Sequence, residues 1–296
     1  MRFTTSVAAV AAAFTLALAG CSAPSGGTTT ATSEDSTISI GVVGASSPEW
    51  AVFTEKATEL GIDVEIRDFT DYTTPNPAVT DGSLTANQFQ HLLYLARYNI
   101  DNNADLVPIA STAIYPLALY SNSATSLADI EEGAQIAVPN DETNKSRAIH
   151  LLAENGLLTL REGTGIIAAE EDIDPAASRV TVAPMDAQQT VTALPSIAGA
   201  VVNNDFVNDA GLDPSAALAE DDPADESAQP YINVFVVRAA DADNERLLQL
   251  ATLFHDADFE AALAEQSADS AVIVDDTPEE LQQILAGVTE SLRANS

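Results

Sequence analysis

Residues 37–66 contain a strand, a helix and a second strand with very short connections between them. Residues 37–43 alternate in polarity and then become apolar, as a strand does. Ser47-Pro48-Glu49 has the residue types of a helix start, and Gly61 is a typical helix end. The alternating residues 62–66 predict a second strand. Units of this kind occur in parallel sheets with crossover helices, so this stretch constrains the chain to an α/β fold.

The later sequence repeats this alternation over most of the 296 residues. Apolar segments predict strands at 84–89, 106–110, 114–120, 135–138, 180–183, 198–202 and 231–237, and amphipathic segments predict helices that include 243–255, 258–266 and 278–293. We expect two lobes, each a mixed sheet flanked by helices, with residues 37–118 and 234–296 in the first and residues 119–233 in the second. A ligand would bind between the lobes, at the carboxyl ends of the strands.

The N-terminus has the pattern of an export signal rather than of a folded element. Arg2 precedes an apolar run at 7–19 that is too short to span a bilayer, and Leu-Ala-Gly-Cys follows. This resembles the lipobox of bacterial lipoproteins, so we interpret residues 1–20 as a signal peptide and Cys21 as the lipidation site, bearing acyl chains such as palmitate. An ordinary signal peptide with a chance cysteine is the alternative. Residues 21–36 predict a flexible tether.

Composition limits the partners of the protein. The formal net charge of −34 argues against nucleic acid and anionic lipid headgroups. No second membrane segment is visible, so we expect contact with the cell membrane through the lipid anchor only, on its extracytoplasmic side. A single cysteine excludes an internal disulfide. In so acidic a chain, each basic residue is more informative.

Residues 138–148 run from an apolar strand through a Pro-Asn-Asp turn into an amphipathic helix. Free backbone N–H groups and the helix dipole favour an anion at such a helix start. Asn144 and Arg147, three residues apart, would project from one face of the first turn. A guanidinium can bind both oxygens of a carboxylate, so we expect a carboxylate here. In the alternative reading, Asn140 or Asp141 merely caps the helix and Arg147 is a solvated surface residue.

Further polar residues lie at or directly after the ends of predicted strands, where a binding cleft would collect them. They are Tyr72, Asn87, His91, Asn144, Arg147, Asn203 and Asn233. Phe89 and Tyr94 supply aromatic surface that could enclose an apolar or thioether side chain. Each has an ordinary alternative, because asparagines cap turns, His91 can begin a helix and the aromatic residues can belong to the core.

Motifs for catalysis or metal binding are absent from the sequence. It contains no glycine-rich phosphate loop, no His-Glu-x-x-His pair and no Gly-x-Ser-x-Gly elbow. Three histidines, His91, His150 and His255, with one cysteine give little support for a zinc site. We therefore expect neither an enzyme nor a metal or cofactor.

A series of short motifs is spread over most of the chain after residue 37. They are Phe69-Thr70-Asp71-Tyr72 with Pro75-Asn76, Asp81-Gly82, Ala86-Asn87-Gln88-Phe89-Gln90-His91 with Tyr94-Leu95, Pro139-Asn140-Asp141 with Asn144 and Arg147-Ala148, Ala210-Gly211-Leu212, and Tyr231-Ile232-Asn233. Together they resemble the methionine-binding lipoproteins of the NlpA family, the substrate-binding components of ABC importers. The resemblance implies a two-lobed periplasmic-binding-protein fold of type II and capture of a free amino acid, L-methionine foremost.

The resemblance also assigns roles to residues and partners to the protein. In that family, an arginine and asparagines hold the carboxylate and ammonium groups of the ligand, which here are Asn144, Arg147, Asn203 and Asn233. Aromatic and histidine residues surround the ligand side chain, which here are Tyr72, Phe89, His91 and Tyr94. The implied partners are an ABC permease and its ATPase, and we expect a monomer.

The chain departs from the family pattern in several places. Residues 44–50 read Gly-Ala-Ser-Ser-Pro-Glu-Trp where family members usually have a Pro-His pair, and Pro77 follows Asn76 unusually. A long acidic loop at 213–229 precedes Tyr231, and residues 270–272 replace a Tyr-x-Gly type of ending. These departures leave open another small amino acid or a peptide as the ligand, or a surface lipoprotein that serves in adhesion without transport.

Overall fold

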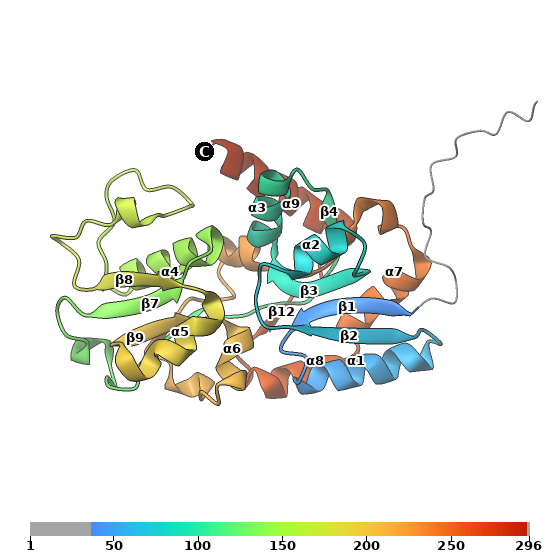
Figure 1. The fold of residues 1–296 in the computed structure, drawn as a ribbon, viewed down its shortest axis with the longest axis horizontal. Helices are drawn as coiled ribbons and strands as arrows, with labels where there is room; N and C mark the ends of the chain where they lie inside the picture. The colour runs from blue at the N-terminus through green and yellow to red at the C-terminus, as the bar shows by residue number, and fades with distance from the viewer. Residues whose placement is uncertain (1–36, 295–296) are drawn as a thin grey trace, which may run out of the picture. The chain divides into compact units, whose positions relative to one another are not determined.

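The computed structural model describes residues 37–294, apart from the side chains of Asn208, Asp209 and Glu226 (Figure 1). The predictions of a signal peptide at 1–20, of lipidation at Cys21 and of a tether at 21–36 fall outside the described residues. Among the helices of the described part, none is both long enough and apolar enough to span a membrane.

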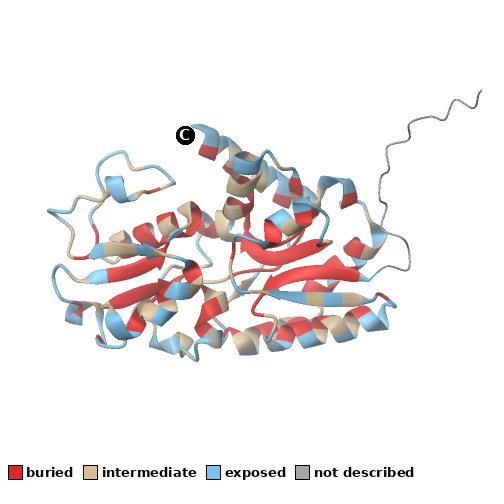
Figure 2. Ribbon diagram, viewed as in Figure 1, coloured by how far each residue is buried: buried red, intermediate tan, exposed pale blue. Residues whose placement is uncertain are grey.

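The first sheet has five strands in the order β2-β1-β3-β11-β4. Its strands are β1 (Ile38–Val43), β2 (Val64–Phe69), β3 (Ala86–His91), β4 (Leu106–Ser111) and β11 (Asn233–Arg238). β1 is parallel to β2 and β3, whereas β11 is antiparallel to β3 and β4. β1 and β3 are buried along their whole length (Figure 2), as expected for central strands covered by helices on both faces.

Helices cover both faces of this sheet because alternate strand residues point to opposite sides. Along β11, Phe235 and Val237 belong to one apolar core, whereas Val234 and Val236 belong to another. The first core contains residues of α1 (Pro48–Glu59), α7 (Glu245–Ala251) and α8 (Ala257–Gln266), and the second contains residues of α2 (Pro75–Thr80), α3 (Leu92–Asn102) and α9 (Pro278–Ala294). The short strand β3 leads directly into α3, so His91 ends one element and caps the next.

The second sheet has five strands in the order β10-β6-β9-β7-β8. Its strands are β6 (Ala118–Tyr120), β7 (Gln135–Pro139), β8 (Thr181–Met185), β9 (Gly199–Val202) and β10 (Ala219–Glu220). β7 is parallel to β8 and β9, and β6 is antiparallel to β9 and β10. The helices beside it are α4 (Glu142–Glu154), α5 (Ala187–Ala193) and α6 (Asn204–Asp209). The mixed α/β fold predicted from the sequence is therefore confirmed.

Two sequence-based expectations differ from the structure. The apolar segment at 114–120 is not one strand, because Pro116 interrupts it between β5 (Ala113–Ile114) and β6. β5 pairs with β12 (Val272–Ile273) in a separate two-stranded sheet, whereas β6 pairs with β9 and belongs to the second five-stranded sheet. The segment expected to be a long acidic loop contains β10 and two 3₁₀ turns. The two-lobe division at 118/119 and 233/234 stays a prediction.

Candidate functional site

A cavity is lined by residues from both five-stranded sheets and from the helices beside them. The space between its lining atoms, including the part open to solvent, is about 430 Å³. The lining residues are Tyr72, Phe89, Gln90, Tyr94, Tyr115, Pro116, Leu117, Asn144, Arg147, Asn203, Asn204, Asp205 and Asn233. This set includes every predicted ligand residue except His91, which lies behind Asn144. Their contact with a ligand stays a prediction.

The start of α4 is built by its N-cap residue, Asp141. One carboxylate oxygen accepts hydrogen bonds from the Asn144 backbone N–H at 2.9 Å and from Thr143 Oγ1 at 2.9 Å. Both oxygens lie 3.1 Å from the Asn144 Nδ2 donor. Burial raises the pKa of the Asp141 carboxyl. Asp141 therefore caps the helix, as the alternative reading held, but Arg147 is only 5% exposed and is not a surface residue.

The Arg147 guanidinium is held on three sides by the protein. Its Nε donates to Asp221 Oδ2 at 2.6 Å, and its Nη2 donates to Asp221 Oδ1 at 3.0 Å and to the Tyr115 carbonyl at 2.8 Å. The Tyr231 ring lies 4.1 Å from Cζ, a cation–π geometry. Nη1 donates no hydrogen bond to any residue in the described part of the chain. The arrangement fixes the guanidinium and leaves Nη1 as the donor for a bound anion.

A chain of hydrogen bonds orients Asn203. Its Nδ2 donates to Asn144 Oδ1 at 2.8 Å, and His91 Nε2 lies 3.4 Å from the same oxygen. His91 Nδ1 accepts from the Tyr94 backbone N–H at 3.1 Å, so the proton of the imidazole is on Nε2. Burial, together with the Arg147 charge, lowers the pKa of His91 to about 3 and keeps the ring neutral. The Asn203 Oδ1 atom is buried and has no hydrogen-bond partner among the described residues.

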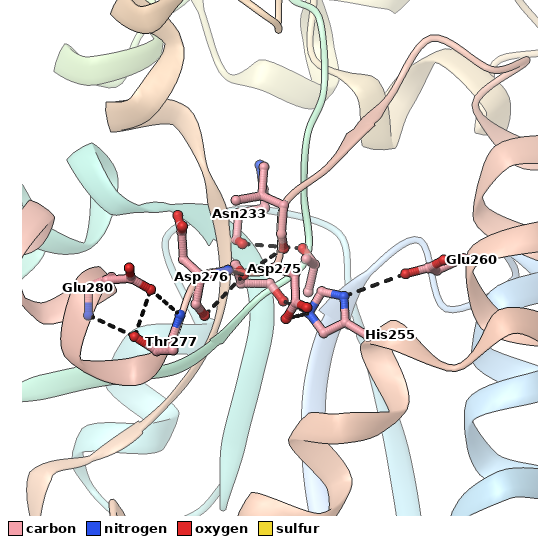
Figure 3. A network of polar contacts seen from close by, with 10 residues as sticks. Asn233, His255, Glu260, Asp275, Asp276, Thr277 and Glu280 are labelled. Carbon is pink, nitrogen blue, oxygen red and sulfur yellow. Dashed lines mark hydrogen bonds and ion pairs between the residues drawn. The ribbon is translucent and has the colours of Figure 1, made fainter.

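Asn233 reaches the site although it begins a strand. β11 runs antiparallel to β3 and pairs Asn233 with His91, so the start of β11 meets the carboxyl ends of the parallel strands. The Asn233 carbonyl accepts from the Thr112 backbone N–H at 2.9 Å. His255 Nε2 donates to the carbonyl of Ser111, the residue before Thr112, at 3.1 Å. Figure 3 shows Asn233 and His255 in the same network of polar contacts. These contacts fix the backbone behind Asn233.

Aromatic rings form the remaining wall of the cavity. The Phe89 ring centroid lies 5.8 Å from those of Tyr72 and Tyr94, and the Tyr72 and Phe206 centroids are 5.3 Å apart. Tyr94 Oη donates to the Tyr72 carbonyl at 2.7 Å, and Tyr72 Oη donates to Asp205 Oδ2 at 2.7 Å. The two tyrosine hydroxyl groups are thus used within the protein, and Tyr72, Phe89 and Tyr94 give the cavity an apolar wall.

One further residue named as a cleft candidate, Asn87, does not line this cavity. It is fully buried in an amide cluster, in which its Nδ2 donates to Asn76 Oδ1 at 2.9 Å and its Oδ1 accepts from Gln90 Nε2 at 2.9 Å. Side-chain amides can satisfy each other in this way without water or ligand. The expectation for Asn87 was wrong because β3 runs from Ala86 to His91, so Asn87 lies near the start of the strand and not at its carboxyl end.

Sequence reasoning also missed residues that shape the site. Asn204 and Asp205 directly follow Asn203, so their position was open to inference. Asp221 had no such signal, because it lies in a loop with many carboxylates and only the structure shows which one pairs with Arg147. Tyr115 was expected inside a strand.

The model of the NlpA lipoprotein family matches residues 38–274. The chain belongs to the NlpA lipoprotein family. A probable D-methionine-binding lipoprotein MetQ of Vibrio cholerae is 35% identical over 241 residues, which are 80% of this chain and 85% of that protein. The substrate-binding protein of a methionine transporter from Streptococcus pneumoniae has a TM-score of 0.74 at 35% identity and covers 80% of this chain and 95% of its own. A nutrient-binding protein from Burkholderia cenocepacia bound to methionine has a TM-score of 0.74 at 32% identity, over 80% of this chain and 99% of that one.

Membership in the NlpA family confirms the resemblance drawn from the motifs and the periplasmic-binding-protein type of fold. The family consists of substrate-binding transport proteins, so the protein is not an enzyme.

Proposed function

We propose that this protein captures methionine, or a closely similar amino acid, and delivers it to an ABC permease and its ATPase. It acts as a monomer on the extracytoplasmic side of the cell membrane, anchored by acyl chains on Cys21. Several acyl chains on one residue are sufficient for stable anchoring. Relatives named for D-methionine binding and a neighbour bound to methionine support the choice of ligand.

The observation that carries the proposal is that one cavity contains an unpartnered hydrogen-bond donor, an unpartnered acceptor and an aromatic wall. The hydrogen bonds of Arg147 within the described residues all come from Nε and Nη2, which leaves Nη1 as a charged donor, and Asn203 Oδ1 is a buried acceptor without a partner there. A carboxylate on the first and an ammonium group on the second match the two ends of an amino acid. The rings of Tyr72, Phe89 and Tyr94 then enclose the side chain, and aromatic contacts favour a thioether.

The contacts are divided between elements of the two sheets, which couples binding to closure. Asn233 and Phe89 belong to the first sheet, whereas Asn144, Arg147 and Asn203 follow strands of the second. A ligand that contacts both sets favours the arrangement in which they lie together. The Tyr72–Asp205 hydrogen bond of 2.7 Å connects the same two parts. We infer that a permease recognises this closed arrangement.

Calorimetric titration of the full-length protein in detergent tests the proposal. After removal of any bound ligand by unfolding and refolding, both enantiomers of methionine are titrated, beside N-acetyl-L-methionine and L-methionine methyl ester. These analogues lack the ammonium and the carboxylate groups respectively, so each should bind at least tenfold more weakly than the free amino acid. Absence of heat with either enantiomer, from a folded protein, would contradict the proposal.

A variant pair locates the site. Asn203→Ala removes the unpartnered acceptor and should weaken methionine binding tenfold or more. The matched control is Asn122→Ala, because Asn122 is exposed and lies outside the cavity. Equal affinities of the two variants would place the ligand elsewhere.

A further inference from the structure

A second cavity adjoins the proposed amino-acid site. The two share Phe89, Tyr115, Asn204, Asp205 and Asn233 as lining residues. The space between the lining atoms of the second cavity, including the part open to solvent, is about 450 Å³. Any group that extends from an amino acid past these shared residues would therefore enter the second cavity.

The second cavity contains a buried carboxyl group without a partner. Glu49, in the first turn of α1, is 6% exposed, and its Oε2 atom is buried without a hydrogen-bond partner among the described residues. No lysine, arginine or histidine of the described chain forms an ion pair with it. A polar group in this condition costs free energy unless a donor reaches it.

The neighbours of Glu49 add negative charge rather than compensate it. Burial, followed by the Asp205 charge, raises the pKa of Glu49 to about 7. Asp205 lines both cavities, and burial, followed by the charges of Glu49 and Asp205, raises the pKa of the Tyr115 hydroxyl. The cavity is also lined by Gln88 and Thr112, so its wall is polar on this side as well. A thioether forms no strong hydrogen bonds with these groups, whereas an ammonium group can donate hydrogen bonds to the carboxyl oxygens.

Neighbours of Glu49 at the start of α1 also line the second cavity. Ser47 and Trp50 are lining residues, and Trp50 in addition packs edge-to-face on Phe53 in the first core.

We propose that the second cavity is a subsite for a second ammonium group of the ligand, held by Glu49 with Asp205. The proposal rests on the proposed function, because the first cavity would still hold the carboxylate and α-amino groups or their peptide equivalent. The preferred ligand is then an amino acid with an amine at the end of its side chain, or methionine extended at its amino end by one residue. Both carry the same chemistry into the cavity, a charged amine, and the test separates them.

The test compares three ligands by calorimetric titration of the full-length protein in detergent. L-lysine carries the second amine on the side chain, glycyl-L-methionine carries its amine one residue away, and L-methionine lacks the extension. At least one of the first two should bind ten times more tightly than L-methionine, and which one does identifies the source of the amine. Methionine binding as tight as, or tighter than, both would overturn the subsite and leave the proposed function intact. Failure of all three ligands, and of D-methionine, would contradict both.

A substitution tests whether Glu49 is responsible for the tighter binding of the amine ligand. Glu49→Gln keeps the size of the side chain and removes its charge, so it should weaken the preferred amine ligand at least tenfold more than it weakens methionine. Glu55→Gln, on an exposed position of the same helix, is the matched control and should leave both affinities unchanged. An equal loss for both ligands in Glu49→Gln would show a structural effect and overturn the proposal. Thermal unfolding of each variant without ligand verifies that the fold is retained.

Discussion

Arg147 and Glu49 are both ionisable side chains buried beside neighbouring cavities, yet the protein treats them differently. Arg147 is met by a carboxylate with two hydrogen bonds, by a backbone carbonyl and by an aromatic ring. Glu49 has an oxygen without a partner among the described residues, and burial, followed by the charge of Asp205, raises its pKa. A buried charge that the protein pairs is held in one position, where it can bind a ligand. A buried carboxylate without a partner costs free energy until a ligand supplies a donor. By this comparison, the cavity beside Arg147 is a preorganised site, and the proposed subsite at Glu49 is completed only when a ligand binds.

The largest expected effect comes from removing the partner of Arg147. Asp221→Ala leaves a buried guanidinium without its carboxylate and should lower the free energy of unfolding by about 3–5 kcal/mol. Urea unfolding followed by circular dichroism measures it. Asp222→Ala, at the exposed neighbouring position, should stay within about 0.5 kcal/mol of the parent. Similar small losses in both variants would mean that Arg147 is not stabilised by its pair.

The next effect concerns His91, which burial, together with the Arg147 charge, keeps neutral. The pKa of His91 is about 3 in the folded protein against an ordinary value of 6.5, so below pH 6.5 the unfolded chain binds a proton that the folded one does not. Stability should therefore fall by about 3 kcal/mol from this group between pH 7 and pH 4. Urea unfolding over this pH range should show a flatter dependence for His91→Gln. Identical pH dependence of parent and variant would contradict the assignment.

Glu49 should show the opposite pH dependence. Its pKa is raised from 4.5 to about 7, so between these pH values the folded protein keeps a proton that the unfolded chain releases, and stability is lost as the pH rises from 4.5 to 7. Without ligand, Glu49→Gln should be more stable than the parent at pH 8 by about 2–3 kcal/mol and nearly equal to it at pH 4. Denaturant unfolding at both pH values measures the difference. A variant that is less stable at pH 8 would show that Glu49 has a partner after all.

The smallest effect concerns the ring that covers Arg147. Tyr231→Leu removes the cation–π contact and should cost about 1 kcal/mol of stability, whereas Tyr231→Phe keeps the ring and should cost little. Thermal unfolding of the two variants compares them directly. Equal losses would assign the effect to the hydroxyl or to packing instead of to the ring face.

Periodicity and turn residues predicted most elements because they act locally. The start of α1 at Pro48 and the Asp141 cap, which was the alternative reading of that turn, both agree with the structure. The break at Pro116 was missed because the flanking residues are uniformly apolar and suit either one strand or two. Which partner each short strand takes depends on residues far away in the chain.

The candidate site was predicted only where a residue type and a strand end coincided. Arg147 and Asn203 could be selected in this way, and so could the ring wall. Asp221 and Glu49 could not, since one is among many acids and the other looked like an ordinary acid in the first turn of a helix. Whether a buried charge has a partner depends on the tertiary structure, and the local sequence does not contain this information.

We propose that Arg147 Nη1 binds the carboxylate of an amino acid and that Asn203 Oδ1 binds its ammonium group. A crystal structure of the protein with bound methionine tests it most directly. We predict the ligand carboxylate within hydrogen-bond distance of Arg147 Nη1 and its ammonium group within hydrogen-bond distance of Asn203 Oδ1. A ligand carboxylate bound away from Arg147, with the Arg147–Asp221 pair unchanged, would contradict the account.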